Sequence, residues 1–289
     1  MLYTFGSSLM WGLMPIYFKS LQTVPAFEIM LHRIVWSLLF IVLLLSMRKQ
    51  WSWLRSALRQ PKVLAGFALS AFLLSGSWYV YVWAVNNGQV VDASLGYFIT
   101  PLANVLLGFL LLKERLRPVQ WAAVALATAG VAWLGWQSGH VPWIGIGMAA
   151  TFGIYGLLRK TAALGALEGL ALETLILFPL AAVTLGVLAF NGNAAFSTAP
   201  GSLQWLLLAA GPLTVVPLLM FAAGARRVSM SLLGIMQYFG PMLQLVLAVW
   251  LYGESFSGAR MAGFAIIWAA LALYSGEGIW RAWVAKRRA

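Results

Sequence analysis

The sequence matches itself at a nearly constant separation of 140 or 141 positions. Leucine and alanine matches arise easily in any apolar chain, so the informative matches are those of charged residues, prolines and glycines. They are Gly12 with Gly153, Lys19 with Lys160, Glu28 with Glu168, Arg33 with Glu173, Pro101 with Pro241 and Glu114 with Glu254. One separation kept over several segments predicts an internal duplication, with a first repeat at 1–140 and a second at 141–289.

The composition is that of an integral membrane protein. Hydrophobic residues make up 62% of the 289 residues and charged residues only 9%, whereas soluble domains are about 25% charged. One membrane-spanning helix needs about 20 apolar residues, and the apolar stretches of this chain then predict ten spans. They are expected near residues 2–19, 26–47, 63–85, 92–112, 118–136, 143–159, 168–190, 203–225, 229–252 and 260–279.

Each repeat holds five predicted spans. An odd number of spans means that the second repeat enters the membrane from the side opposite to the first. We therefore expect an all-α integral membrane fold of ten transmembrane helices, arranged as two five-helix repeats of inverted topology. Such repeats are typical of secondary transporters, in which two pseudo-symmetric halves rock about a site near the middle of the bilayer.

The net charge of +12 does not indicate nucleic-acid binding, because the basic residues fall in alternate loops. They gather at 48–62, at 113–117, at Arg159 and Lys160, at 226–227 and in the short tail after 280. Lys and Arg accumulate on the cytoplasmic side of membrane proteins, so both termini are expected in the cytoplasm. Segment 48–62 is expected to lie along the inner headgroups.

Two predicted spans carry matching polar stripes. Residues spaced three or four apart share one helix face. The stripes are Tyr97, Pro101, Asn104 and Gly108 in span 92–112, and Gln237, Pro241, Gln244 and Ala248 in span 229–252. Amides are costly against lipid and must face protein or a cavity. Either they tie helices together, or they line a substrate cavity on the pseudo-twofold axis, which the matched positions favour.

Aromatic residues add further candidates for a cavity wall. Trp78 and Tyr81 lie in the span at 63–85, Tyr155 in the span at 143–159 and Trp11 in the first span. Aromatic rings can stack on a flat solute or attract an organic cation. Ordinary packing in the protein core explains these residues equally well.

Charged residues inside the second span stand out. Glu28 and His32 are one helical turn apart, and Arg33 lies about two turns inside the span, with Glu173 at the matching position of the second repeat. Glu28 and His32 are candidates for a proton relay, and Arg33 for a carboxylate or phosphate site. The structural alternative is an ion pair that fixes the helix, or an Arg33 side chain that extends toward the headgroups. The residues favour the structural role for Glu28 and a functional role for His32 and Arg33.

Glu114 and Glu254 directly follow the two striped spans. At such a turn a carboxylate can accept hydrogen bonds from the free N–H groups of the next helix and interact with its dipole. Both are expected to be helix caps.

These features resemble the drug/metabolite transporter superfamily with its EamA-type domains. The run Trp11-Gly12-Leu13-Met14-Pro15 to Lys19, then Glu28, then His32-Arg33-Ile34-Val35-Trp36-Ser37, is similar to the RarD subgroup of bacterial inner-membrane proteins. The resemblance implies an alternating-access carrier of small metabolites, amino acids or drugs, often an exporter. It also implies a central cavity lined mainly by helices 1, 3, 4, 6, 8 and 9, with helix 2 peripheral.

Other function classes fit the sequence less well. The chain lacks the phosphate-binding Gly-x-x-x-x-Gly-Lys-Ser/Thr loop and the zinc motif His-Glu-x-x-His, and it has no cysteine. We expect no enzyme activity, no cofactor and no metal, although a facilitative channel or an intramembrane enzyme stays an alternative. The expected partners are a small-molecule substrate and the lipid bilayer, with proton coupling and a homodimer as open possibilities.

Overall fold

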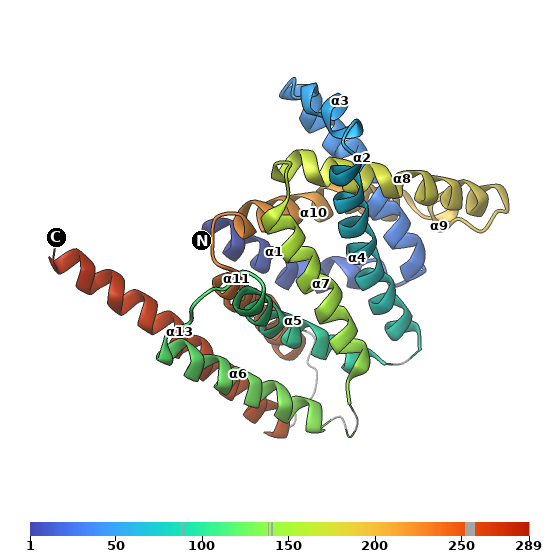
Figure 1. Ribbon diagram of the computed structural model, residues 1–289. Helices are drawn as coiled ribbons and strands as arrows, with labels where there is room; N and C mark the ends of the chain where they lie inside the picture. Colours follow the sequence, from blue (N-terminus) through green and yellow to red (C-terminus); the bar gives the residue numbers. More distant parts are fainter. Residues whose placement is uncertain (88, 138, 140, 252–257, 289) are drawn as a thin grey trace.

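The computed structural model describes the whole chain except residues 88, 138, 140, 252–257 and 289 (Figure 1). The described residues form helices and connecting turns, without a strand. In the first half these helices are α1 (Leu2–Lys19), α2 (Ala26–Met47), α3 (Ser52–Leu58), α4 (Pro61–Asn86), α5 (Val90–Leu110) and α6 (Pro118–Gln137). In the second half they are α7 (Trp143–Thr161), α8 (Ala166–Phe190), α9 (Ala195–Thr198), α10 (Gly201–Ala225), α11 (Met230–Gln237), α12 (Phe239–Val246), the π-helix η1 (Leu247–Leu251) and α13 (Gly258–Arg288).

Among the described residues, helices occupy all the predicted spans, and seven stretches are long and apolar enough to cross a membrane. Those seven are Ala26–Met47, Pro61–Tyr81, Pro118–Gln137, Ala166–Phe190, Gly201–Ala225, Met230–Leu251 and Met261–Gly278. The protein is therefore a multi-pass membrane protein. The predicted spans at 2–19, 92–112 and 143–159 coincide with α1, α5 and α7, which are not among the seven, so ten crossings stay a prediction.

The lower hydropathy of α1 has a structural reason. Its buried face consists of Thr4, Ser7, Ser8 and Gly12. The hydroxyls of Ser7 and Ser8 donate to the Thr4 carbonyl at 2.8 and 3.0 Å, so they are satisfied within their own helix. Small residues with internally satisfied hydroxyls allow neighbouring helices to approach closely, and α1 packs on α10 and α12.

The ninth predicted span is interrupted. It consists of α11, α12 and η1, with the break at Tyr238, three residues before Pro241. A proline lacks the backbone N–H and its ring clashes with the preceding turn, which explains a break at this point. α5, by contrast, continues through Pro101 as one helix.

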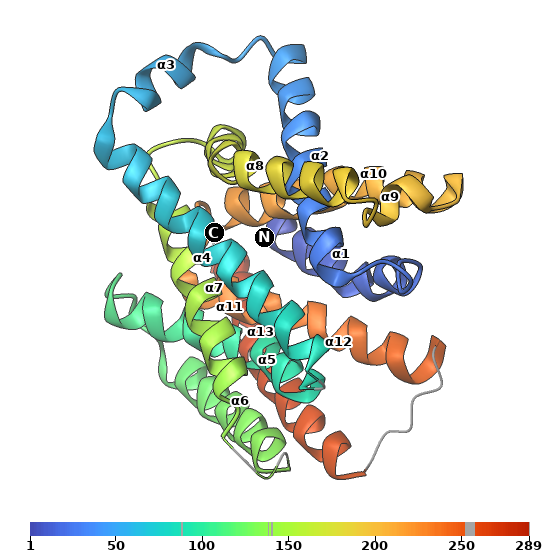
Figure 2. The same ribbon diagram turned by 90° about the vertical axis from the view of Figure 1, so that its right-hand side faces the viewer.

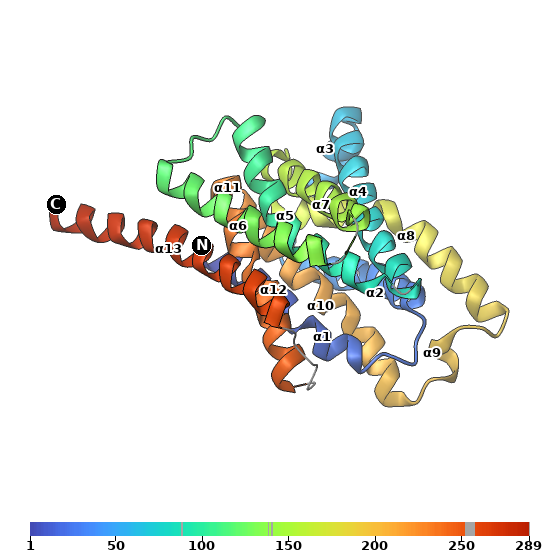
Figure 3. The same cartoon turned by 90° about the horizontal axis from the view of Figure 1, so that it is seen from below.

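The two halves pack in matching ways (Figures 1 and 2). α4 packs on α7 as α10 packs on α1, and α5 packs on α7 as α11 and α12 pack on α1. Three further contacts join corresponding helices, α2 with α8, α5 with α11 and α6 with α13. Figure 3 shows α6 and α13 running side by side, with the C-terminal end of α13 extending past the other helices.

Glycines permit the matching contacts between halves. A Cβ atom on Gly12 would lie 2.8 Å from the Cβ of Leu243, and one on Gly153 would lie 3.4 Å from the Cβ of Ala103. Ala103 and Leu243 are themselves 140 positions apart. The same close helix approach is thus made twice between the halves, each time with the glycine in a different half.

Candidate solute-binding site

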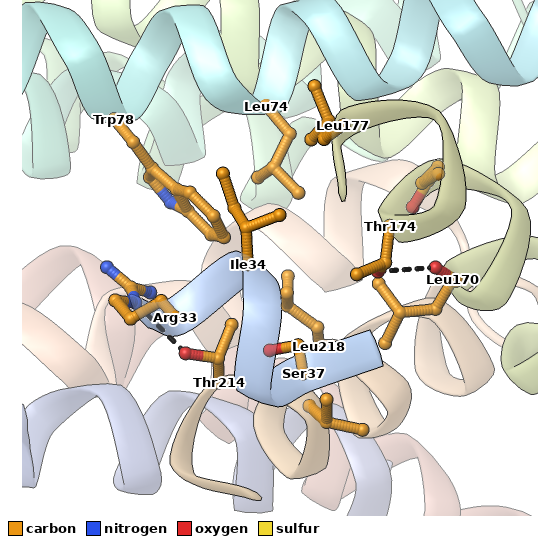
Figure 4. Close-up of a pocket in the computed structure, with 12 residues that line it drawn as sticks. Arg33, Ile34, Ser37, Leu74, Trp78, Leu170, Thr174, Leu177, Thr214 and Leu218 are labelled. Carbon is orange, nitrogen blue, oxygen red and sulfur yellow. Dashed lines mark hydrogen bonds between the residues drawn. The ribbon is translucent and has the colours of Figure 1, made fainter. Parts of the chain in front are cut away.

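A small pocket with a cavity volume of about 20 Å³ lies between α2, α4, α8 and α10 (Figure 4). Its wall combines polar groups with a larger number of apolar side chains. The lining residues are Arg33, Ile34 and Ser37 from α2, Leu74 and Trp78 from α4, Leu170, Glu173, Thr174 and Leu177 from α8, and Thr214, Val215 and Leu218 from α10.

The pocket wall follows the spacing of the predicted internal repeat. Ten of its twelve residues form five pairs whose numbers differ by 140. The pairs are Arg33 with Glu173, Ile34 with Thr174, Ser37 with Leu177, Leu74 with Thr214 and Trp78 with Leu218. Equivalent positions of two related halves can surround one space only if the axis that relates the halves passes close to it.

Arg33 faces inward. Its Nε donates to the Thr214 hydroxyl at 2.9 Å, and its guanidinium carbon lies 4.2 Å from the Trp78 ring centroid and 5.7 Å from that of Phe18. Figure 4 shows Arg33 between Trp78 and Thr214. The side chain therefore contacts α1, α4 and α10.

Glu173 lies on the same pocket wall but is already paired. Its Oε1 is 3.5 Å from a terminal nitrogen of Arg159 and accepts a short hydrogen bond from the Ser70 hydroxyl. Both charged side chains are 1% exposed. The second carboxylate oxygen, Oε2, has no hydrogen-bond partner among the described residues. Arg159 also donates to the Ala166 carbonyl at 2.9 Å.

Sequence reasoning missed Arg159, which it assigned to the cytoplasmic loops. The residue is 1% exposed and sits in the last turn of α7. A sequence signal was present, because Arg159 is four residues after Tyr155, a predicted cavity residue, and so shares its helix face. The sequence also holds no sign of Ser70, which donates to Glu173, or of Thr214, which accepts from Arg33. Serine and threonine are common in membrane helices, so these two do not stand out.

The predicted polar stripes connect helices to each other. Asn104 of α5 donates a short hydrogen bond to Gln237 of α11, and Gln244 of α12 donates to the Trp11 carbonyl of α1 at 3.0 Å. A Cβ atom on Gly234 would lie 2.4 Å from the Pro101 carbonyl, so α5 and α11 cross very closely. Asn104, Pro101, Gln237 and Gln244 do not line the described pocket. Their predicted contact with substrate stays a prediction.

The predicted aromatic candidates separate into two groups. Trp78 lines the pocket, and Tyr81 contacts Tyr97 edge to face with ring centroids 5.9 Å apart. Trp11 and Tyr155 instead pack around Phe221, at 5.5 and 6.0 Å between centroids. This second group packs in the hydrophobic core that also contains Leu218, one of the pocket-lining residues.

Glu28 and His32 form a buried contact at the start of α2. The Glu28 carboxylate accepts from the backbone N–H groups of Ala195 and Phe196 at 3.1 and 3.3 Å. His32 Nε2 is 3.6 Å from Glu28 Oε1, and His32 Nδ1 accepts from Trp36 Nε1 at 3.0 Å. The group ties α2 to the segment between α8 and α10, in agreement with the structural interpretation of Glu28.

Glu114 is a helix cap, but for a different helix than expected. It accepts from the backbone N–H groups of Met230 and Ser231, at the start of α11, and not from the helix that follows it in the sequence. The prediction that it caps the next helix is therefore wrong. The chain turns after α5 so that the carboxylate reaches across to the other half. Glu254, its predicted counterpart, lies outside the described residues.

Comparison with known proteins gives consistent matches. Residues 1–136 match the EamA-like transporter family. An uncharacterized transporter of Pseudomonas aeruginosa is 49% identical over 280 residues, which cover 96% of this chain and 92% of the relative. The protein RarD of Escherichia coli is 45% identical over 270 residues, covering 93% of this chain and 91% of the relative.

The fold is also known from a solved structure. A protein of known crystal structure superposes with a TM-score of 0.72 at 23% identity, over 94% of this chain and 95% of that chain. At this identity the likeness concerns the fold alone. The long, high-identity matches concern the family, and the chain belongs to the EamA-like transporters of the drug/metabolite transporter superfamily as a RarD-like protein.

Proposed function

We propose that this protein is a secondary active transporter that moves a small solute across the bacterial inner membrane by alternating access, in the direction of export. The pocket between α2, α4, α8 and α10 is its solute site. The named relatives are transporters, which supports the general class of function. The mechanism and the site are inferred from this chain's own pocket.

The pairing of the pocket wall carries the proposal. Arg33, Leu74 and Trp78 line the same space as Glu173, Thr214 and Leu218, which lie 140 positions further along the chain. A site on the axis between inverted halves can open to either side when one half rocks against the other. An apolar wall with a few fixed polar groups is also the usual composition of a small-molecule site.

A transport assay on the reconstituted protein tests the proposal. We expect purified protein in liposomes to accelerate counterflow of at least one labelled solute from a panel of organic anions, amino acids, nucleobases and organic cations. Leu177→Trp fills the pocket and should abolish that flux. Leu180→Trp makes the same change on α8 at a side chain that is 70% exposed, and should leave the flux unchanged.

Two outcomes contradict the proposal. One is a folded, reconstituted protein that accelerates flux of no solute in the panel. The other is a flux that Leu177→Trp and Leu180→Trp affect equally, since the pocket would then not lie on the transport route.

A further inference from the structure

The charges around the pocket do not balance. Arg33 and Glu173 both line it, but the Glu173 carboxylate is already paired with Arg159 at 3.5 Å. No carboxylate among the described residues forms an ion pair with Arg33. The three charges together leave one positive charge, carried by Arg33.

A cation within a membrane helix that lacks a counter-ion is costly. The contacts that Arg33 makes reduce this cost without neutralising the charge. The Thr214 hydroxyl accepts from Nε, and the faces of Trp78 and Phe18 attract the guanidinium through their ring quadrupoles. These partners engage one edge and the faces of the group, and leave its terminal N–H groups without a described hydrogen bond.

The free edge of a guanidinium has a definite chemical preference. Its parallel N–H groups match the two oxygens of a carboxylate, which they bind in a bidentate manner. Apolar side chains make up the larger part of the wall, and Ile34, Leu74 and Leu177 are among them. A ligand that suits both features has one carboxylate and a compact aliphatic body.

We propose that the pocket binds a small aliphatic monocarboxylate, with the carboxylate on the terminal N–H groups of Arg33 and the body against Leu74 and Leu177. This inference rests on the proposed transport function and names the substrate class for the same site. Thr214 and Trp78 act as positioning residues, because they hold the guanidinium plane and do not neutralise it.

Matched ligands test the inference. The probes are 4-methylpentanoate, its neutral amide 4-methylpentanamide, the cation 4-methylpentylamine, and leucine, which adds an α-ammonium to the same acid. A ligand that binds only the folded protein raises the unfolding temperature with its concentration. We expect stabilisation by the acid, and a dissociation constant about tenfold or more higher for the amide and the amine, since hydrogen bonds to charged groups are the stronger ones.

Variants connect the effect to Arg33. Arg33→Gln should weaken 4-methylpentanoate about tenfold or more, by removal of the charge-assisted hydrogen bonds, and Arg33→Lys should recover part of the loss because it restores the charge without the planar fork. The matched control is Arg115→Gln, which removes an exposed positive charge outside the helices and should leave affinity unchanged. If Arg33→Gln does not fold, the affinity of Arg33→Lys for 4-methylpentanoate is compared with that of the wild type, and a weaker affinity of the variant supports the inference.

Several results would overturn the inference. They are equal stabilisation by the acid, the amide and the amine; no stabilisation by the acid or by leucine up to their solubility limits; or undiminished binding of the acid by Arg33→Lys and Arg33→Gln. Tighter binding of leucine than of the acid would also overturn it, because the ligand would then be a zwitterion. Flux of a non-carboxylate solute would leave the transport function standing while this inference fails.

Discussion

Glu114 accepts hydrogen bonds from both the backbone N–H and the hydroxyl of Ser231, at 3.0 and 2.8 Å. The same carboxylate accepts from the Met230 N–H at 2.6 Å, so it caps the N-terminus of α11, where a negative charge is favoured. Glu114 belongs to the first half and α11 to the second. Any motion that separates α5 from α11 at this end must therefore break all three hydrogen bonds.

Further bonds lie at the same end of the bundle. Lys160, in the last turn of α7, donates to the carbonyls of Ala225 and Val228, and Arg226 donates to the Ala162 carbonyl at 3.3 Å. These contacts join the connections α7–α8 and α10–α11. With Glu114 they form a polar closure that would lie on the cytoplasmic side in the proposed topology.

Removal of Glu114 should therefore favour opening toward the cytoplasm. The chain has no cysteine, so Met230→Cys, at a fully buried position, introduces a single reporter thiol. We expect Glu114→Ala to raise its labelling rate by a membrane-impermeant reagent in inside-out vesicles about tenfold, the effect of losing a charge-assisted hydrogen bond. Glu277→Gln, which removes an ion pair with Arg117, serves as the control. Equal labelling rates in the Met230→Cys protein with and without Glu114→Ala would show that the Glu114 carboxylate does not restrict access to this position.

The pair of Arg159 and Glu173 predicts strongly non-additive stability effects. Loss of one partner leaves an uncompensated charge at a site that is 1% exposed, at a cost of about 3–5 kcal/mol in the free energy of unfolding. Arg159→Met alone should therefore destabilise the protein more than Arg159→Met with Glu173→Leu. The free energy of unfolding of the wild type, the two single variants and the double variant is measured by denaturant unfolding in detergent. Additive effects of the two substitutions would contradict a direct pair.

Two glycines predict opposite responses to the same substitution. A Cβ on Gly211 would lie 2.4 Å from the Trp36 carbonyl oxygen, whereas one on Gly76 would meet no atom within 4 Å. Backbone atoms cannot move aside cheaply, so Gly211→Ala should cost about 1–3 kcal/mol. Gly76→Ala should be neutral or stabilising by up to about 1 kcal/mol, because alanine is the better helix former. Thermal unfolding of both variants checks the prediction, and similar shifts would argue against the close approach of α2 and α10.

The side-chain amides of the two stripes are expected to be needed for transport but not for insertion into the membrane. Asn104 ties α5 to α11 and Gln244 ties α12 to α1, so both hold the helices that surround the crossing of the halves. We expect Asn104→Ala and Gln244→Ala to insert normally and to lose counterflow. Thr128→Ala is the control, since its exposed hydroxyl donates only within α6. Wild-type flux in both amide variants would show that Asn104 and Gln244 have no role in transport.

The helices and three pocket residues were accessible from the sequence. Apolar stretches bounded by charges and by Pro or Gly turns predict helices with little ambiguity, because a chain in lipid must satisfy its backbone within each segment. Arg33, Glu173 and Trp78 were singled out by charge or aromatic character at membrane depth, and all three line the pocket.

The remaining features depend on contacts between distant segments. Periodicity places Asn104 on a helix face, but it cannot say that this face meets Gln237 and not a cavity. Glu114 follows α5 in the sequence and yet caps α11, because the chain folds back across the other half. From the sequence, Arg159 resembles a loop cation. Only the fold shows that its side chain is buried beside Glu173 of the next helix.

Access to Ser37 tests the central claim, that one pocket serves both sides of the membrane, most directly. Ser37 lines the pocket and is 3% exposed, and Ser37→Cys would be the only thiol in the chain. The measurement is the labelling rate by a membrane-impermeant thiol reagent in right-side-out and in inside-out vesicles. Alternating access predicts reaction from both sides, slowed in each case by a bound solute. Reaction from one side only, or from neither side in a folded protein, would contradict it.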